Sequence, residues 1–158
     1  MLNMQKLGMK QNKVKIMKIL FVCTGNTCRS PMAEALAKIL FPKYDFGSAG
    51  LYVNQTDSVS ANAVLAMKNY GMDISEHKPT QLTVEKAAEY DYIIPMTSSH
   101  KQILLANGIN PDKILMFKEE ISDPFGQNLE TYLSCAEQLK YNIKITIGEF
   151  NEIGELND

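Results

Sequence analysis

The sequence predicts an α/β fold, a single-domain three-layer sandwich in which helices cover both faces of a four-stranded parallel sheet. The length of 158 residues suits one domain with a hydrophobic core. Apolar runs of strand length alternate along the chain with segments whose apolar residues recur at helical spacing. This alternation is typical of parallel strands joined by helices, which leave both faces of the sheet in need of cover.

The first half of the chain carries two of the expected strands and two helices. Ser30 can cap the first helix, and Pro31 fits its first turn, where a missing N–H costs little. Gly50 ends the second strand, and Gly71 closes the second helix. The strands are expected at 19–22 and 44–49, and the helices from about 30 and over 60–70.

The second half adds two strands and three helices. Pro95 stands near the end of the third strand, where the loss of one backbone donor is tolerated. Apolar residues recur at helical spacing in the last helix: Leu133, Ala136, Leu139, Ile143 and Ile147. The strands are expected at 92–96 and 114–117, and the helices at 83–90, from 98 or 99 to 107, and from 129 to about 150.

Composition excludes several function classes. The formal net charge of -2 argues against a chain that coats nucleic acid or an anionic membrane, so neither is expected as a partner. Three cysteines are a poor disulfide framework and suit a reducing compartment, the cytoplasm. Neither they nor the two histidines have zinc-ligand spacing, so no metal is expected.

The N-terminal segment is expected to lie outside the domain. It begins with basic residues, as a signal peptide does, but Lys18 interrupts the following apolar stretch and no cleavage site follows. Residues 1–16 are therefore predicted to be an N-terminal extension, disordered or non-native, with Met17 as a candidate native start. The domain is predicted to span residues 17–158.

A polar loop, residues 23–30, joins the first strand to the first helix. It places the thiol of Cys23 and the guanidinium of Arg29 six positions apart, at a helix N-terminus whose backbone amides attract anions. Arg29 offers a planar fork of donors to two phosphoryl oxygens, and the positive potential favours the thiolate of Cys23. The hydroxyl of Ser30 can donate to that sulfur.

The other residues of the loop suit an oxyanion cradle. Gly25 and Asn26 tolerate the left-handed conformations that turn backbone donors inward. A bare Cys-x5-Arg pattern is weak, but its position between a strand and a helix supports a nucleophilic Cys23. The residues expected to bind phosphate or another oxyanion are Thr24, Gly25, Asn26, Thr27, Cys28 and Ser30.

Asp123 is the candidate proton donor. Asp123 and Pro124 follow the fourth expected strand, and parallel strands end at the same edge of a sheet, so the pair should lie near loop 23–30. From the residues alone, Asp-Pro is also a common turn initiator, and both interpretations stay open. His100 is expected to be solvated at a helix start, and Cys135 to lie in the core.

Residues 22–34, VCTGNTCRSPMAE, closely resemble the signature of low molecular weight protein tyrosine phosphatases, and residues 123–125, DPF, resemble the general-acid motif of that family. Further matches are Ser48-Ala49-Gly50 and His77 with Gln81-Leu82-Thr83. The resemblance implies a monomeric phosphatase without a cofactor that acts on phosphorylated proteins. Cys23 would attack phosphorus, Arg29 would hold the oxygens, and Asp123 would serve as acid and then as base.

The resemblance also implies supporting roles. Asn26, Ser48 and His77 match residues that hydrogen-bond the loop into shape. Cys28 matches a cysteine that can form a reversible disulfide with the nucleophile; the alternative is a filler residue against the wall of the loop.

Two positions bear on the substrate. Tyrosine-directed members usually carry a bulky aliphatic residue where this chain has Thr27, and aromatic residues beyond the Asp-Pro pair, where it has Gly126. Both features resemble the bacterial protein-arginine-phosphatase branch. A threonine hydroxyl can hydrogen-bond a guanidine, which suits that substrate. Tyr52 and Phe125 are expected to line the substrate pocket.

The alternative substrate is phosphotyrosine. Arsenate reductases share the loop but need redox cysteines, and this chain has none between Cys28 and Cys135. A phosphocysteine carrier would need no general acid, and the presence of Asp123 argues against one.

Overall fold

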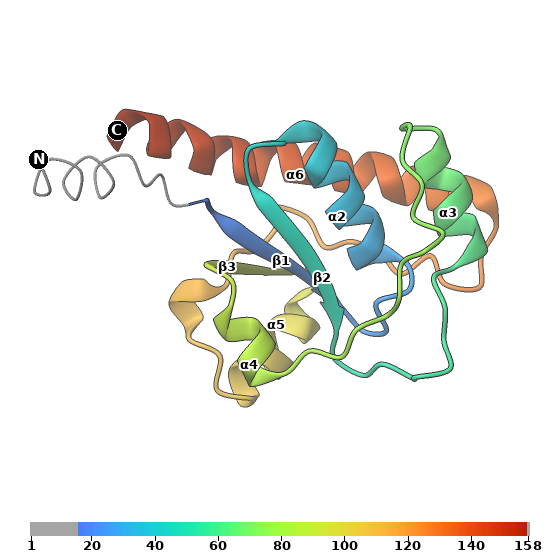
Figure 1. The fold of residues 1–158 in the computed structure, drawn as a ribbon, viewed down its shortest axis with the longest axis horizontal. Coiled ribbons are helices and arrows are strands. Elements are labelled where there is room, and N and C mark those ends of the chain that lie inside the picture. The colour runs from blue at the N-terminus through green and yellow to red at the C-terminus, as the bar shows by residue number, and fades with distance from the viewer. Residues whose placement is uncertain (1–15, 158) are drawn as a thin grey trace, which may run out of the picture.

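The computed structural model describes residues 16–157 and shows an α/β fold built on a parallel sheet (Figure 1). The strand order is β2 (Asp45–Gly50), β1 (Lys18–Cys23), β3 (Tyr92–Pro95), and β1 pairs in parallel with both neighbours. All three strands therefore end at one edge of the sheet. The expected extension, residues 1–16, lies outside the described residues except for Ile16.

Helices cover both faces of the sheet, as expected, and β1 shows why. Ile19 and Phe21 point to one face and pack in a core with α2 (Arg29–Leu40), α3 (Ala61–Lys68) and α6 (Leu129–Asn157). Leu20 and Val22 point to the other face, toward α4 (Val84–Ala88) and α5 (Ser98–Ala106). All four side chains are almost completely buried, which explains why the strand is continuously apolar.

The fourth strand expected over 114–117 is wrong. In the part of the chain that the structure describes, this segment forms only one isolated bridge, between Ile93 and Ile114. The donors of β3 alternate between its two neighbours, and Met96 N already donates to β1, so the next donor toward the outer segment would be residue 95. Pro95 has no N–H, and the pairing ends there.

All five expected helices are present, with shifted ends. α2 begins at Arg29 with Cys28 at its N-cap, so Ser30 lies inside the first turn and does not cap the helix. α6 extends to Asn157, beyond the expected end near 150, and a short 3-10 helix spans Pro111–Lys113.

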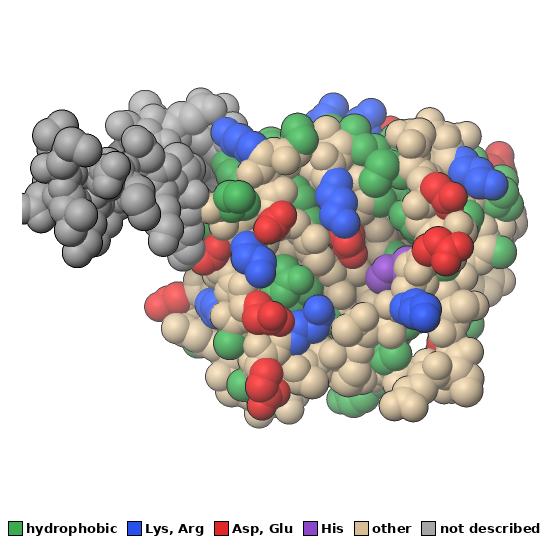
Figure 2. Space-filling view, viewed as in Figure 1, with side chains coloured by type: hydrophobic (Ala, Val, Ile, Leu, Met, Phe, Trp, Pro, Cys, Tyr) green, Lys and Arg blue, Asp and Glu red, His purple; other side chains and the backbone are tan. Residues whose placement is uncertain are grey.

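The surface agrees with the small net charge. On the face shown in Figure 2, acidic and basic side chains are interspersed, and neither sign dominates a large area. Among residues 16–157, no helix is both long and apolar enough to cross a membrane.

Candidate active site

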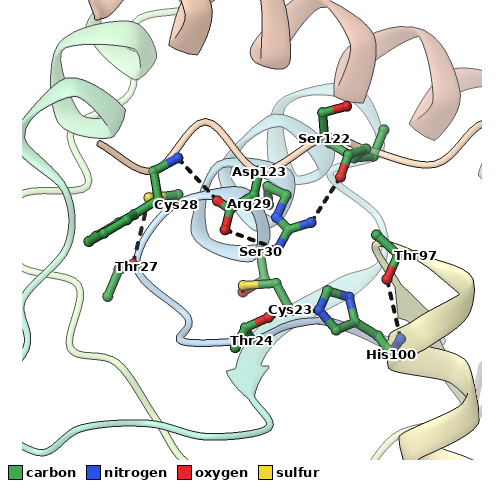
Figure 3. Close-up of polar contacts among 12 residues, drawn as sticks. Cys23, Thr24, Thr27, Cys28, Arg29, Ser30, Thr97, His100, Ser122 and Asp123 are labelled. Atoms are coloured by element: carbon green, nitrogen blue, oxygen red, sulfur yellow. Dashed lines mark hydrogen bonds and ion pairs between the residues drawn. The ribbon is translucent and has the colours of Figure 1, made fainter. Parts of the chain in front are cut away.

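The cysteine loop, residues 23–30, connects β1 to α2 at the carboxyl edge of the sheet (Figure 3). Cys23 is the last residue of β1 and is 3% exposed. Its Sγ lies 2.9 Å from Oγ of Ser30, which is fully buried in the first turn of α2. Strand and helix thus bring a thiol and a hydroxyl together from opposite ends of the loop.

Asn26 donates a hydrogen bond to the same serine hydroxyl. It is buried with a φ of 57°, in the left-handed region that asparagine tolerates, whereas Gly25 has no positive φ. Thr80 N donates to Asn26 Oδ1 at 2.9 Å, which orients the amide so that its Nδ2 donates to Ser30 Oγ at 2.7 Å. Ser30 Oγ accepts this bond and keeps its own hydrogen, which it can donate to the sulfur when Cys23 is a thiolate.

The two residues expected to support the loop behave differently. His77 Nε2 lies 3.1 Å from both the carbonyl and the Oδ1 of Asn26, so it braces the left-handed turn. Ser48 Oγ donates instead to Glu34 Oε1 at 2.6 Å, which joins β2 to α2. Of these two side chains, His77 contacts the loop, whereas Ser48 joins the strand and the helix beside it.

The chain after β2 presses against the cysteine loop. A Cβ on Gly50 would lie 2.8 Å from the carbonyl oxygen of Thr24, so a larger residue would push the loop away. Tyr52 N donates to that same carbonyl at 2.9 Å, and Ser60 N donates to the carbonyl of Thr27 at 2.9 Å. These two loop carbonyls therefore accept hydrogen bonds from residues outside the loop.

The backbone amides inside the loop, unlike its carbonyls, have no partners among the described residues. In the described chain, the backbone N–H groups of residues 24–28 donate no hydrogen bond to another residue, and they precede the N-terminus of α2. Arg29, the single arginine of the sequence, is 5% exposed and adds its guanidinium. A group of donors without acceptors, at the positive end of a helix, is suited to bind an anion.

Arg29 also connects the loop to the aspartate segment, residues 119–125. Its Nη1 donates to the carbonyl of Ile121 at 2.9 Å, and its Nη2 lies 3.6 Å from Asp123 Oδ2. Figure 3 shows the Asp123 carboxylate and the Cys23 thiol grouped around this guanidinium. The side chain of Asp123 is 52% exposed, so it is open to solvent on one side and faces the arginine on the other.

The aromatic residues expected to form the pocket walls, Tyr52 and Phe125, are 67% and 70% exposed. Each is attached to the site through its own backbone N–H, which donates to a residue of the loop or of the aspartate segment. Gly126 has a φ of 77° in a turn closed by Gln127 N and the carbonyl of Pro124. This backbone conformation accounts for the glycine without reference to any substrate.

Cys28 is anchored to α6. Its Sγ lies 3.2 Å from the hydroxyl of Tyr132, which also accepts from Ser60 Oγ at 3.0 Å, and 3.6 Å from Thr27 Oγ1. Burial raises the pKa of the Cys28 thiol and raises that of Tyr132 to about 12. Cys28 is therefore a protonated, hydrogen-bonded thiol. Cys135 is buried, as expected for a core residue.

His100 is the residue of the site that the sequence did not reveal. The expectation of a solvated side chain is wrong, because His100 is 5% exposed and its Nε2 lies 2.9 Å from Thr24 Oγ1. Burial, with the charge of Arg29 as a further cause, lowers the pKa of His100 to about 4, so the ring is neutral. The one signal in the sequence was its place just beyond β3, at the edge where the cysteine loop lies.

These groups can carry out acyl or phosphoryl transfer to sulfur. They combine a thiol in contact with a hydroxyl, a group of free backbone donors with a guanidinium, and a carboxylate beside that guanidinium. The described residues contain no cluster of three or more histidine, cysteine or acidic side chains that could hold a metal ion.

Comparison with known proteins agrees with this geometry. The family model described as "Low molecular weight phosphotyrosine protein phosphatase" matches residues 18–152. A low molecular weight protein-tyrosine-phosphatase, PtpB of Staphylococcus haemolyticus, is 38% identical over 138 residues, which cover 80% of this chain and 95% of the relative.

Two solved structures share the fold. The YwlE arginine phosphatase of Geobacillus stearothermophilus has a TM-score of 0.80 at 32% identity, over 89% of this chain and 96% of its own. A YwlE arginine phosphatase mutant with a phosphorylated active-site serine has a TM-score of 0.76 at 32% identity, over 81% and 91% of the two chains.

Proposed function

The chain belongs to the low molecular weight phosphotyrosine protein phosphatase family, and from this premise we propose that it removes phosphoryl groups from phosphoarginine residues of proteins. It is a cysteine-dependent hydrolase of this family. The observation that carries the assignment of its centre is the 2.9 Å contact of Cys23 Sγ with the Ser30 hydroxyl, beside loop amides that have no acceptor in the described chain.

In the first proposed step, the thiolate of Cys23 attacks phosphorus while Arg29 and the loop amides bind the equatorial oxygens. The bond from phosphorus to the leaving nitrogen or oxygen breaks, and the leaving group takes a proton from Asp123. The product of this step is a phosphocysteine. The phosphorylated active-site serine in the YwlE mutant supports a covalent intermediate of this kind.

In the second proposed step, water attacks the phosphorus of the phosphocysteine. Asp123, now a carboxylate, accepts a proton from that water, and the sulfur–phosphorus bond breaks. The hydrogen bond from Ser30 stabilises the departing thiolate of Cys23. Inorganic phosphate leaves and the enzyme returns to its starting protonation state.

The preference for phosphoarginine rests on Thr27. This residue lies inside the cysteine loop, and its Oγ1 contacts the thiol of Cys28 at 3.6 Å, a weak interaction that leaves the hydroxyl able to bond a guanidine. The likeness to arginine phosphatases supports the same substrate. Gly126 gives no support to this substrate preference, because its positive φ already favours a glycine at this position.

Phosphotyrosine is the second candidate. It is favoured by the likeness to PtpB, whose identity to this chain exceeds that of the YwlE structures. The exposed rings of Tyr52 and Phe125, which are attached to the cysteine loop and the aspartate segment, would also suit an aromatic substrate.

The test compares kcat/KM on phosphoarginine and phosphotyrosine peptides of one sequence, for the wild type, Thr27→Ile and Thr56→Ile. The last variant changes an exposed threonine in the segment after β2 and serves as the control. We expect the wild type and the control to prefer phosphoarginine, and Thr27→Ile to lose that preference by about 10-fold or more. An equal preference in all three would refute the role of Thr27.

We also propose a monomeric enzyme in the cytoplasm. The three cysteines are free in the described structure, which suits a reducing compartment. Sedimentation of the purified chain tests the monomer.

A further inference from the structure

The N-terminal turn of α5, Thr97 to His100, contacts both segments of the site. On one side, His100 Nε2 lies 2.9 Å from Oγ1 of Thr24, the residue that follows the nucleophilic cysteine. On the other side, Ser98 donates from both its backbone N and its Oγ to Glu120 Oε1, at 2.7 and 2.6 Å. One helical turn thus holds a residue from each of two segments that are distant in sequence.

The His100 contact is built into the interior. The ring is 5% exposed, its backbone N–H donates to the capping Thr97 Oγ1 at 3.2 Å, and its Nδ1 has no partner among the described residues. A buried imidazole nitrogen without a partner is costly, and a leucine at this position would avoid that cost. The Nε2 contact with Thr24 is therefore the polar interaction that a histidine provides here.

The Glu120 contact fixes the start of the aspartate segment. The carboxylate of Glu120 binds the N-terminus of α5, where the helix dipole favours a negative charge. Its hydrogen bonds with Ser98 lower the pKa of Glu120, so it is ionised at neutral pH. The next residue, Ile121, is held at both backbone groups, because its N donates to Met96 O at 3.0 Å and its O accepts from Arg29. Asp123 follows two residues later.

We propose that His100 and Glu120 are positioning residues, which dock the cysteine loop and the aspartate segment on the same turn of α5 and so hold Asp123 at a fixed separation from Cys23. This rests on the proposed function of Cys23 and Asp123. The role is positional because neither side chain bonds a reacting atom: His100 acts through Thr24, and Glu120 through the backbone of the aspartate segment.

The measurement is the dependence of kcat/KM on the leaving group, with aryl phosphates whose phenols range from acidic to weakly acidic, because kcat/KM reports the first chemical step, in which the phenol leaves. A misplaced Asp123 slows this step for the substrates that need protonation and spares it for those that do not. We expect His100→Leu and Glu120→Ala to lower kcat/KM on a poor leaving group about 10-fold more than on a good one. Glu89→Ala, at the end of α4, is the exposed control and should leave the dependence unchanged.

Conservative variants separate positioning from folding. Glutamine can place an amide nitrogen near the position of Nε2, and asparagine near that of Nδ1. We expect His100→Gln to restore the leaving-group dependence of the wild type, and His100→Asn to resemble His100→Leu. If His100→Leu does not fold, the Gln and Asn pair alone decides the question, together with Glu120→Ala on the surface.

The proposal is overturned if the folded variants lose thermal stability but keep the leaving-group dependence of the wild type, which is the result of a purely structural role. It is also overturned if His100→Gln and His100→Asn behave alike. A wild-type enzyme without Cys23-dependent hydrolysis would instead contradict the proposed function, so the two failures are distinguishable.

Discussion

Cys23 Sγ and Ser30 Oγ lie 2.9 Å apart, and the amide of Asn26 donates to the same hydroxyl oxygen. A thiolate of Cys23 can only accept, and Ser30 keeps its own hydrogen for it, so the hydroxyl stabilises negative charge on the sulfur before attack and again when the thiolate leaves. Thr80 and His77 contact the amide of Asn26 and therefore affect the thiol indirectly, through Asn26 and Ser30.

Removal of the Ser30 hydroxyl should slow both chemical steps. A hydrogen bond to a charged group contributes about 1.5–3 kcal/mol, so Ser30→Ala should lower kcat by roughly 10- to 100-fold with little change in KM. Pre-steady-state kinetics on an aryl phosphate measure both steps. Ser134→Ala, an exposed serine on α6, is the control, and equal kcat values for the two variants would contradict the role of Ser30.

Asn26 should contribute to stability in two separable ways. Asn26→Gly removes the side-chain hydrogen bonds but tolerates the φ of 57°, whereas Asn26→Ala also strains the backbone. We expect Asn26→Ala to be less stable than Asn26→Gly by about 1 kcal/mol, and both to be less stable than the wild type. Denaturation in urea gives the three free energies of unfolding; an alanine variant as stable as the glycine variant would show that the conformation is not strained.

The sheet and its two helical faces were predictable because they depend on local patterns. The continuous apolar run of β1 requires cover on both faces, and the helices provide it. The absence of the fourth strand was not predictable from Ile114 and its apolar neighbours, because the pairing of this segment depends on a donor in another strand. Pro95 lacks that donor, and hydrophobicity carries no information about it.

Within the site, the residues of one continuous loop were predictable and the contacts across the fold were not. The run from Cys23 to Ser30 is visible as a motif, but Asn26 and Cys28 also have partners outside the loop, Thr80 and Tyr132, which lie more than fifty positions away in the sequence. His100 follows two serines at a helix start, a pattern of exposed residues, yet in the fold it is buried and contacts Thr24, which is distant in sequence.

Arg29→Lys should damage catalysis although the charge is kept. A lysine ammonium cannot bond the carbonyl of Ile121 and two phosphoryl oxygens in one plane. Loss of one such donor group costs about 10²- to 10³-fold in kcat, and a loss of that size is expected here. Steady-state kinetics test this, with Lys38→Ala, an exposed cation on the same helix, as control. A variant within 3-fold or so of the wild type would refute the need for the planar fork.

His100 should make stability depend on pH in a defined window. Its pKa is lowered from 6.5 to about 4, so between these values the unfolded state binds the proton that the folded state excludes. The favourable contribution is complete above pH 6.5 and is lost as pH falls toward 4, by about 3 kcal/mol in total.

The comparison that isolates this effect is the free energy of unfolding of the wild type against His100→Gln at several pH values. As the pH falls from 6.5 toward 4, the free energy of unfolding of the wild type should decrease relative to that of His100→Gln. Above pH 6.5 the difference between the two should stay constant. A difference that is flat over this window would mean that the ring of His100 is not held neutral.

The central claim, that Cys23 is the nucleophile, is tested most directly by exchanging each cysteine of the loop for serine. Burial raises the pKa of the Cys28 thiol, which is also hydrogen-bonded to Tyr132, so Cys28 should not attack. The measurement is the turnover of an aryl phosphate in EDTA. Cys28→Ser should stay within about 10-fold of the wild type, and Cys23→Ser should lose roughly 10⁴-fold or more. Full activity in Cys23→Ser, or the larger loss in Cys28→Ser, would contradict the claim.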